Sequence, residues 1–301
     1  MRRGRITGSS SLGYQVYLDD GSIVRGMRRK GRDVKDGLPM IGDVVLLDDQ
    51  DQIVSFLPRT SVLDRPRVAN LDQAAVTISA KQPDLSTFLL DKYLSACIGA
   101  EIPSFIVVTK WDLLTAEERN SYDHRLDWYR ALGYSLYRIG LGETEDLEAL
   151  RSKVEWKVTA FMGQTGVGKS SLANAIDPSF NRPIGRFDST MGRGTHQTKE
   201  VVLFPFAGGF LADTPGFSDF RLSLKPEQLS EDFPGFGDFY SLCRFKGCLH
   251  NHIVGCAVEK AVKEGKLSED SYQNYLKLLQ DAMGQSRKEK KSSHSSRMKR
   301  S

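Results

Sequence analysis

The feature that most constrains the fold of this chain is a glycine-rich loop between an apolar run and the start of an amphipathic run. Residues 163–171 read GQTGVGKSS, which fits the pattern G-x-x-x-x-G-K-[ST]. Residues 157–162 predict a buried strand, and residues 171–176 predict the start of a helix. A phosphate-binding loop requires this strand, loop and helix, which a chance glycine-rich turn lacks. The sequence therefore predicts a nucleoside triphosphate site in an α/β domain.

Each kind of residue in this loop has its own task in phosphate binding. Glycines let successive backbone N–H groups point at an anion, and the helix N-terminus adds its positive end. Lys169 is expected to reach the β- and γ-phosphates, and Ser170 to bind Mg²⁺. The predicted nucleotide-binding residues of the loop are Gly163, Gln164, Thr165, Gly166, Val167, Gly168, Lys169, Ser170 and Ser171.

A second motif, TKWD at residues 109–112, directly follows the apolar run 105–108. P-loop GTPases read guanine with [NT]-K-x-D at the end of a strand. Asp112 accepts hydrogen bonds from the ring N1–H and the exocyclic amino group together, a pair that adenine does not offer. Lys110 covers the base with its aliphatic stem, and Thr109, in place of the commoner Asn, has one hydroxyl to orient the loop. Together with the phosphate loop, this motif predicts GTP and GDP as the ligands.

The segment that follows the phosphate-loop helix predicts a magnesium switch. Residues 184–198 are rich in glycine and charge, which is typical of a mobile loop. Thr195 and Thr198 are both candidates for the threonine that completes the Mg²⁺ shell when the γ-phosphate is present.

A predicted hairpin, residues 201–206 and 209–212, leads to the sequence DTPG at residues 213–216. Alone, this sequence is equally an ordinary turn. After a phosphate loop, Asp213 is expected to hold Mg²⁺ through water and the Gly216 N–H to sense the γ-phosphate. Phe217 stands where Ras-like proteins carry a water-orienting Gln, so slow intrinsic hydrolysis is expected.

The order of these motifs is unusual. The guanine motif precedes the phosphate loop, and no [NT]-K-x-D follows Gly216. The sequence therefore predicts a circularly permuted GTPase domain. In G proteins a Ser-Ala pair after a later strand supports the guanine O6, but residues 137–142 read YRIGLG, so we expect a backbone contact near Gly140 instead.

The first 62 residues predict a small all-β domain. Tyr14, Val16 and Leu18 alternate with polar residues, and five short strands are expected in total. This pattern fits an OB-type barrel, the oligonucleotide/oligosaccharide-binding fold, although an SH3-like barrel gives the same pattern. Residues 28–32 (RRKGR) are expected to project as a basic finger, and residues 58–67 to form a linker.

Three of the four cysteines cluster near the C-terminus in the pattern Cys243-x₄-Cys248-x-His250-x₅-Cys256. Three thiolates and one imidazole suit one tetrahedral, structural Zn²⁺ with no open position. The alternatives are buried reduced cysteines without a metal, or His252 in place of His250.

Residues 267–283 predict a helix and residues 285–301 a disordered basic tail. Cys97 falls on the apolar face of a predicted helix, which indicates packing.

Charge and hydropathy limit the possible partners. No apolar run is long enough to span a membrane, and no secretory signal is seen, so we expect a protein of the reducing cytoplasm. Residues 2–35 hold nine Lys/Arg against three Asp, and residues 287–300 hold seven Lys/Arg against one Glu. Either basic end alone is as consistent with solubility, but two basic ends favour a nucleic acid partner.

A β-barrel, a permuted GTPase domain and a Cys₃His group, in this order, resemble the bacterial ribosome small-subunit-dependent GTPase A family. The resemblance covers nearly the whole chain and includes GRGTHQT at residues 192–198. The family's switch loop usually reads G-R-G-x-H-T-T. By position, Thr198 is then the switch threonine rather than Thr195, although Gln197 departs from the pattern. His196 matches the family's switch histidine, which the resemblance implies helps to position the attacking water.

The resemblance implies a monomeric cytoplasmic GTPase that binds the small ribosomal subunit and its rRNA late in assembly, with slow hydrolysis that the subunit stimulates. The expected domains are an OB-type barrel (1–62), a permuted GTPase domain (68–221), a zinc and helical module (222–284) and a basic tail (285–301). Two alternatives stay open. One is a GTPase for another RNA partner, and the other is an RNA-binding chaperone that GTP merely gates.

Overall fold

The computed structural model describes residues 1–28, 38–64, 67–142, 145–178, 201–213, 222 and 224–298. The chain forms two compact units. Unit 1 comprises Met1–Asp84, Ile102–Thr115 and Leu136–Phe220, and unit 2 comprises Leu85–Glu101, Ala116–Ser135 and Arg221–Ser301. The helices at residues 87–99 and 116–131 therefore group with the C-terminal residues.

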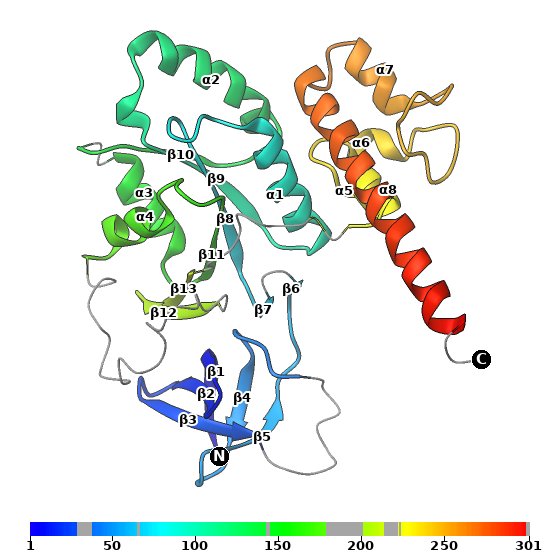
Figure 1. Ribbon diagram of the computed structural model, residues 1–301. Coiled ribbons are helices and arrows are strands. Elements are labelled where there is room, and N and C mark those ends of the chain that lie inside the picture. The colour runs from blue at the N-terminus through cyan, green and yellow to red at the C-terminus, as the bar shows by residue number, and fades with distance from the viewer. Residues whose placement is uncertain are drawn as a thin grey trace. The chain divides into compact units, whose positions relative to one another are not determined.

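Unit 1 begins with a closed five-stranded barrel, drawn in blue in Figure 1. Its strands are β1 (Arg2–Ser10), β2 (Gly13–Leu18), β3 (Ile23–Arg28), β4 (Val44–Leu47) and β5 (Gln52–Phe56). A simple meander places β4 beside β3. Here β5 pairs with β3 in parallel, and β4 closes the barrel on β1. This order, β1-β2-β3-β5-β4, is that of an OB-type barrel and confirms the predicted fold.

Alternating side chains fill the barrel interior, as the sequence pattern predicts. The fully buried members are Ile6, Val16, Leu18, Val45, Leu47 and Ile53. The predicted basic finger cannot be compared, because residues 29–37 lie outside the described residues.

The segment predicted as a linker contains a small hairpin, β6 (Val62–Asp64) with β7 (Arg67–Ala69). Side chains attach its flanks to the barrel. Arg59 forms an ion pair with the buried Asp43 at 2.6 Å. The Asn70 amide donates to the Gly42 carbonyl at 3.0 Å, and its oxygen accepts from the Thr60 N–H at 2.9 Å. The connection is therefore structured, which its composition did not indicate.

A six-stranded sheet follows in the order β10-β9-β8-β11-β13-β12. The strands are β8 (Gln73–Ser79), β9 (Ser104–Thr109), β10 (Leu136–Ile139), β11 (Val158–Met162), β12 (Val202–Phe206) and β13 (Gly209–Asp213). All are parallel except β12, which pairs with β13 in an antiparallel ladder. Every residue of β8 and β11 is buried, as expected for central parallel strands.

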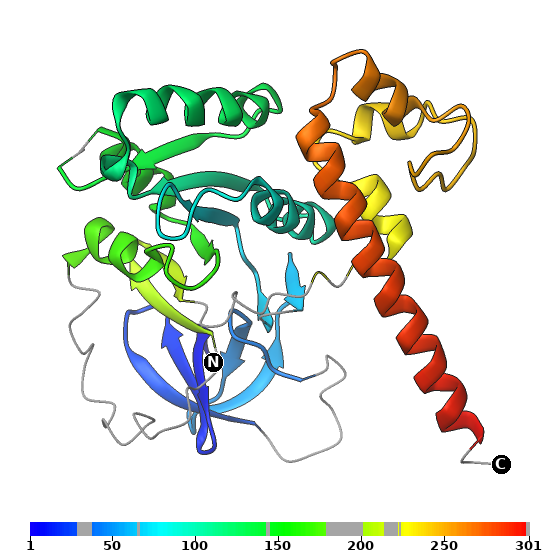
Figure 2. The same ribbon diagram turned by 45° about the horizontal axis from the view of Figure 1, so that its top comes forward.

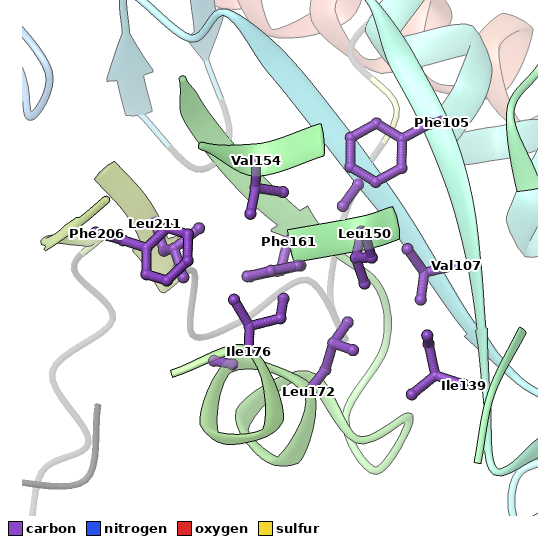
Figure 3. Close-up of a cluster of buried hydrophobic side chains, with 12 residues drawn as sticks. Phe105, Val107, Ile139, Leu150, Val154, Phe161, Leu172, Ile176, Phe206 and Leu211 are labelled. Atoms are coloured by element: carbon purple, nitrogen blue, oxygen red, sulfur yellow. The ribbon is translucent and has the colours of Figure 1, made fainter. Parts of the chain in front are cut away.

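Two helices of unit 1, α3 (Glu145–Val154) and α4 (Lys169–Ile176), pack on this sheet. Figure 3 shows their side chains meeting those of the strands in one apolar cluster. Its buried members are Ala75, Phe105, Val107, Ile139, Leu150, Val154, Phe161, Leu172, Ala173, Ile176, Phe206 and Leu211. This core fixes the loops at the ends of the strands.

Unit 2 is helical. It contains α1 (Thr87–Gly99), α2 (Ala116–Ala131), α5 (Pro226–Asp232), α6 (Gly237–Tyr240), α7 (Ala257–Lys263) and α8 (Glu269–Met298). Figure 2 shows α8 as one long helix. The sequence predicted a disordered tail from residue 285, but this prediction was wrong, because α8 continues to Met298. No Gly or Pro follows Gly284 before residue 298, so nothing in the sequence ends the helix there. Among the described residues, no helix is long and apolar enough to cross a membrane.

The centre of unit 2 holds a buried carboxylate, Asp91 of α1. It accepts hydrogen bonds from Tyr129 of α2 at 2.8 Å and from Asn274 and Ser271 of α8 at 2.8 and 3.2 Å. Burial outweighs these bonds and raises the pKa of Asp91 to about 7. This carboxyl group therefore joins α1 and α2 to α8, which lies about 180 residues further along the sequence.

Candidate nucleotide-binding site and metal centre

The loop between β11 and α4 has the backbone that a phosphate-binding loop needs. Gly166 and Gly168 have φ angles of 84° and 87°, a left-handed conformation that glycine adopts without strain. A Cβ at Gly163 would lie 2.2 Å from the Thr77 carbonyl oxygen of β8, so only glycine fits where the loop leaves the sheet. Val167 is buried and anchors the loop in the core.

The polar side chains of this loop lie against its backbone or at the protein surface. The Lys169 Nζ donates to the carbonyl oxygens of Gly163 at 2.7 Å and Gln164 at 2.9 Å, so its ammonium group lies against the loop. Thr165, Ser170 and Ser171 are exposed. The loop thus combines an ammonium group, a helix N-terminus and exposed hydroxyls, a set that suits a phosphate chain with a cation.

The guanine motif lies directly beside the phosphate loop. The Thr109 hydroxyl is 2.5 Å from the Val167 carbonyl oxygen, and the Lys110 Nζ donates to the Gly166 carbonyl at 2.9 Å. Lys110 also bonds the Gln82 carbonyl, in the loop after β8. The two motifs are over fifty residues apart in sequence, and they meet because only β8 separates β9 from β11 in the sheet.

The loop after β10 reaches the same place. Asp112 lies in a short 3₁₀ turn (Trp111–Leu113) after β9 and is half-buried. A Cβ on Gly140 would lie 2.8 Å from the Asp112 N and 3.0 Å from its Oδ1. The backbone at Gly140 therefore packs against Asp112, the residue predicted to read guanine, at the position where the sequence predicts a backbone contact to the base.

The remaining predicted site residues are described only in part. β13 ends at Asp213, and because β13 runs parallel to β11, this residue lies at the same edge of the sheet as the phosphate loop. The side chain of Asp213, and all of His196, Thr198, Gly216 and Phe217, lie outside the described residues. Their predicted roles stay predictions.

The second site lies in unit 2, where Cys243, Cys248, His250 and Cys256 meet. Their ligand atoms all lie within 4.8 Å of one another. The His250 Nδ1 is 3.5 Å from the Cys243 sulfur and 3.3 Å from the Cys256 sulfur, and these two sulfurs are 4.0 Å apart. Tetrahedral Zn²⁺ places its ligand atoms about 3.5–3.8 Å apart, so the donor set fits that ion.

Hydrogen bonds orient these ligands. The Nε2 of the buried His250 lies 3.2 Å from the Ser230 carbonyl oxygen, to which it donates, so Nδ1 faces the sulfurs. The backbone N–H groups of Ala257 and Glu259 donate to the sulfurs of Cys243 and Cys256 at 3.3 and 3.4 Å. Burial lowers the pKa of His250 to about 4, so the ring is neutral at pH 7. His252, the alternative ligand, is exposed.

Comparison with known proteins agrees with this architecture. Residues 56–223 match the family model described as RsgA GTPase. The chain is 36% identical over 293 residues to the small ribosomal subunit biogenesis GTPase RsgA of Halalkalibacterium halodurans, covering 95% of this chain and 98% of that protein. It is 37% identical over 293 residues to the protein of the same name from Bacillus pumilus, covering 93% of this chain and 97% of that protein.

Two solved structures share the fold. One is YloQ, described as a circularly permuted GTPase, with a TM-score of 0.78 and 30% identity over 95% of this chain and 96% of that one. The other is YjeQ from Thermotoga maritima, with a TM-score of 0.80 and 29% identity over 94% of this chain and 99% of that one. This chain is therefore a GTP hydrolase with a circularly permuted GTPase domain, and it belongs to the RsgA GTPase family.

Proposed function

We propose that this protein hydrolyses GTP in the late maturation of the small ribosomal subunit, binds that subunit through its rRNA, and turns over slowly until the subunit stimulates it. One contact carries the nucleotide part of the proposal. The Thr109 hydroxyl meets the Val167 carbonyl oxygen and so joins the guanine motif to the phosphate loop. The subunit part is supported by relatives named small ribosomal subunit biogenesis GTPase.

The proposed roles follow the chemistry of each group. The loop of residues 163–171 and the Lys169 ammonium bind the phosphates, and Asp112 selects guanine. Ser170 and Thr198 would bind Mg²⁺ directly and Asp213 would hold it through water, and the ion would supply charge neutralisation at the phosphates.

Hydrolysis needs a group that orients the attacking water. Phe217 stands at the Gln position of Ras-like proteins, and a phenyl ring cannot do this. We assign the task to His196, or to an RNA group of the subunit. Either choice explains why turnover should depend on docking.

The Cys₃His group is proposed to hold one Zn²⁺. Four protein ligands leave no open position for water or substrate, so the ion is structural. In this role it fixes the turns of residues 243–256 against α5 and α8, where Ser230, Tyr272 and Tyr275 bond the same segment.

The RNA contacts are proposed to lie on the barrel and the basic ends. An OB-type barrel is a common carrier of nucleic acid contacts, and Lys/Arg outnumber acidic residues by six over residues 2–35. Phosphate contacts of this kind weaken steeply as salt rises. We propose that the protein acts as a monomer in the cytoplasm.

The test is GTP turnover by the full chain alone and with purified small subunits, at two salt concentrations. We expect stimulation by orders of magnitude, which fades at the higher salt concentration. The same turnover is measured in parallel with purified large subunits and with tRNA. Stimulation by one of these alone would move the enzyme to another RNA partner.

A second candidate function is an RNA chaperone that GTP gates, with hydrolysis incidental. The Phe at position 217 favours it, because the usual water-orienting side chain is missing. A variant that binds GTP without hydrolysing it distinguishes the two. Its release from the subunit at the normal rate favours the gated chaperone, and its retention favours the hydrolysis cycle.

A further inference from the structure

The loop between α3 and β11 presents a tryptophan to solvent at the edge of the sheet opposite to the nucleotide site. Trp156 is 76% exposed, whereas Trp111 is buried and Trp128 is half-buried. An exposed indole forfeits the burial energy that aromatic side chains usually supply. The helix α3 ends at Val154, two residues before this tryptophan.

The backbone of Trp156 is also in a conformation that disfavours this residue. Its φ is 60°, the left-handed region, where a helix C-terminus usually carries Gly or Asn. The Trp156 N–H donates to the Ala207 carbonyl at 3.0 Å, and the Lys157 carbonyl accepts from the Phe210 N–H at 2.9 Å. These two bonds to the β12–β13 hairpin hold the strained residue in place. Exposure and strain on one residue point to a function rather than to folding.

The hairpin also fixes the orientation of the ring. A Cβ on Gly208 would lie 2.1 Å from the Trp156 Cε3, so the indole rests on a glycine that leaves room for it. The rest of the ring is open, as its exposure requires. The result is a flat aromatic surface with a fixed position and a solvent-facing side.

The charged residues that flank Trp156 in the sequence are mainly positive. Arg151, Lys153 and Lys157 are all exposed, and Glu155 is the one acidic residue among positions 151–157. The Lys153 Nζ lies 5.9 Å from the centroid of the Phe105 ring. The barrel lies close by, because Phe210 contacts the Tyr17 ring at 5.4 Å and the Arg5 guanidinium at 5.6 Å. Exposed cations within a few residues of an exposed ring supply the two kinds of group that proteins use to stack bases and hold phosphates of single-stranded nucleic acid.

We propose that Trp156 is a stacking platform for an unpaired RNA base, with Arg151, Lys153 and Lys157 beside the flanking phosphates. The inference rests on the proposed RNA-binding function and extends the RNA surface from the barrel onto the GTPase domain.

The experiment uses the full chain and a single-stranded RNA of roughly 12 nucleotides, within the length that one such barrel spans. We expect the RNA to quench the indole emission of the unaltered protein. Trp156→Ala should weaken binding about 5-fold to 150-fold, as loss of one stacked base does. Trp156→Phe should retain part of the affinity. Val254→Ala, an exposed apolar residue of unit 2, should change neither signal.

A purely structural role makes a different prediction. Trp156→Asn places a residue that tolerates the left-handed region, so we expect an unchanged or higher melting temperature together with weaker RNA binding. A lower melting temperature with unchanged RNA affinity would overturn the proposal. So would RNA affinity within twofold of normal in Trp156→Ala, or equal quenching by a blunt RNA duplex.

The two proposals can fail separately. If small subunits do not stimulate GTP turnover by the unaltered protein, the ribosomal function fails, and quenching by RNA still decides the role of Trp156. If stimulation is present and Trp156→Ala binds RNA normally, only the stacking proposal fails.

Discussion

The nucleotide edge of unit 1 and the Cys₃His group of unit 2 are built in opposite ways. The nucleotide loops extend from buried parallel strands, and their contacts with one another are single bonds from side chains to backbone carbonyls. The Cys₃His group gathers four side chains within 4.8 Å, beside helices of four and seven residues. Apolar packing thus shapes the first site before any ligand arrives, whereas polar groups shape the second. Losing a polar residue should cost function in unit 1 and stability in unit 2.

The largest expected effect is that of zinc removal. Structural zinc contributes about 10–16 kcal/mol of binding energy in small modules. We expect chelation, or Cys243→Ala, to abolish amide protection in α7 and weaken it in α8, while β8 and β11 stay protected. Hydrogen exchange and zinc content per chain measure this. Cys97→Ala removes a buried cysteine outside the group and should leave the zinc content unchanged. Unchanged hydrogen exchange in α7 after chelation would show that the Cys₃His group does not stabilise unit 2 through a metal.

The next effect concerns Asp91, a second polar group that supports unit 2. Its folded pKa of about 7 lies above the unfolded value of about 3.9, so the folded state binds the proton more tightly. Its contribution to stability is therefore complete below about pH 4 and is lost as pH rises to 7, roughly 4 kcal/mol in all.

Zinc ligands have the reverse dependence, since acid protonates thiolates. The measurement is therefore the difference in unfolding free energy between the unaltered protein and Asp91→Asn from pH 5 to 8. We expect the unaltered protein to lose stability relative to the variant as pH rises. Glu117→Gln, at an exposed residue of α2, should show no such trend. A stability difference that stays flat from pH 5 to 8 would show that Asp91 is already ionised in the folded state.

In unit 1, Lys169→Ala should abolish GTP hydrolysis but leave the stability of the fold unchanged. The Lys169 ammonium group donates to the carbonyl oxygens of Gly163 and Gln164 in the loop, and transition-state donors of this kind are worth on the order of 10²–10³ in rate. Single-turnover GTP hydrolysis measures the loss, and a thermal melt measures the fold. Lys266→Ala, at an exposed ion pair, is the control. Normal turnover would remove Lys169 from the mechanism.

The smallest expected effect is on nucleotide choice. Asp112→Asn replaces two charge-assisted bonds to guanine, so GTP affinity should fall roughly 10- to 150-fold while xanthosine triphosphate gains. Competition binding of the two nucleotides measures the change, with Asp49→Asn in the barrel as control. An unaltered preference for GTP would mean that Asp112 does not read the base.

The sequence predicted the sheet and its loops well, because both depend on local patterns. Apolar runs followed by Gly-rich or polar motifs placed the ends of β9, β11 and β13. It could not choose between barrel types, since alternation predicts strands but not their order. The hairpin β6–β7 was missed because three-residue strands carry little pattern, and Arg59 and Asn70, which hold its flanks, bond across ten or more residues.

Two features depend on tertiary contacts that no local pattern encodes. The end of α3 at Val154 is set by hydrogen bonds of Trp156 and Lys157 to a distant hairpin. The burial of Asp91 was missed, although a signal existed: it lies three residues before Leu94, on the side of the helix that the apolar residues mark as buried. Its partners on α8 lie about 180 residues away, beyond the reach of any periodicity.

The division into units has a consequence for how the protein can be taken apart. The chain passes between the units five times, at residues 84/85, 101/102, 115/116, 135/136 and 220/221. Deleting residues 221–301 therefore leaves α1 and α2 behind, with Asp91 stripped of its Asn274 and Ser271 donors. No single protease cut separates the units, so a shortened chain reports on a damaged GTPase domain rather than on an independent one.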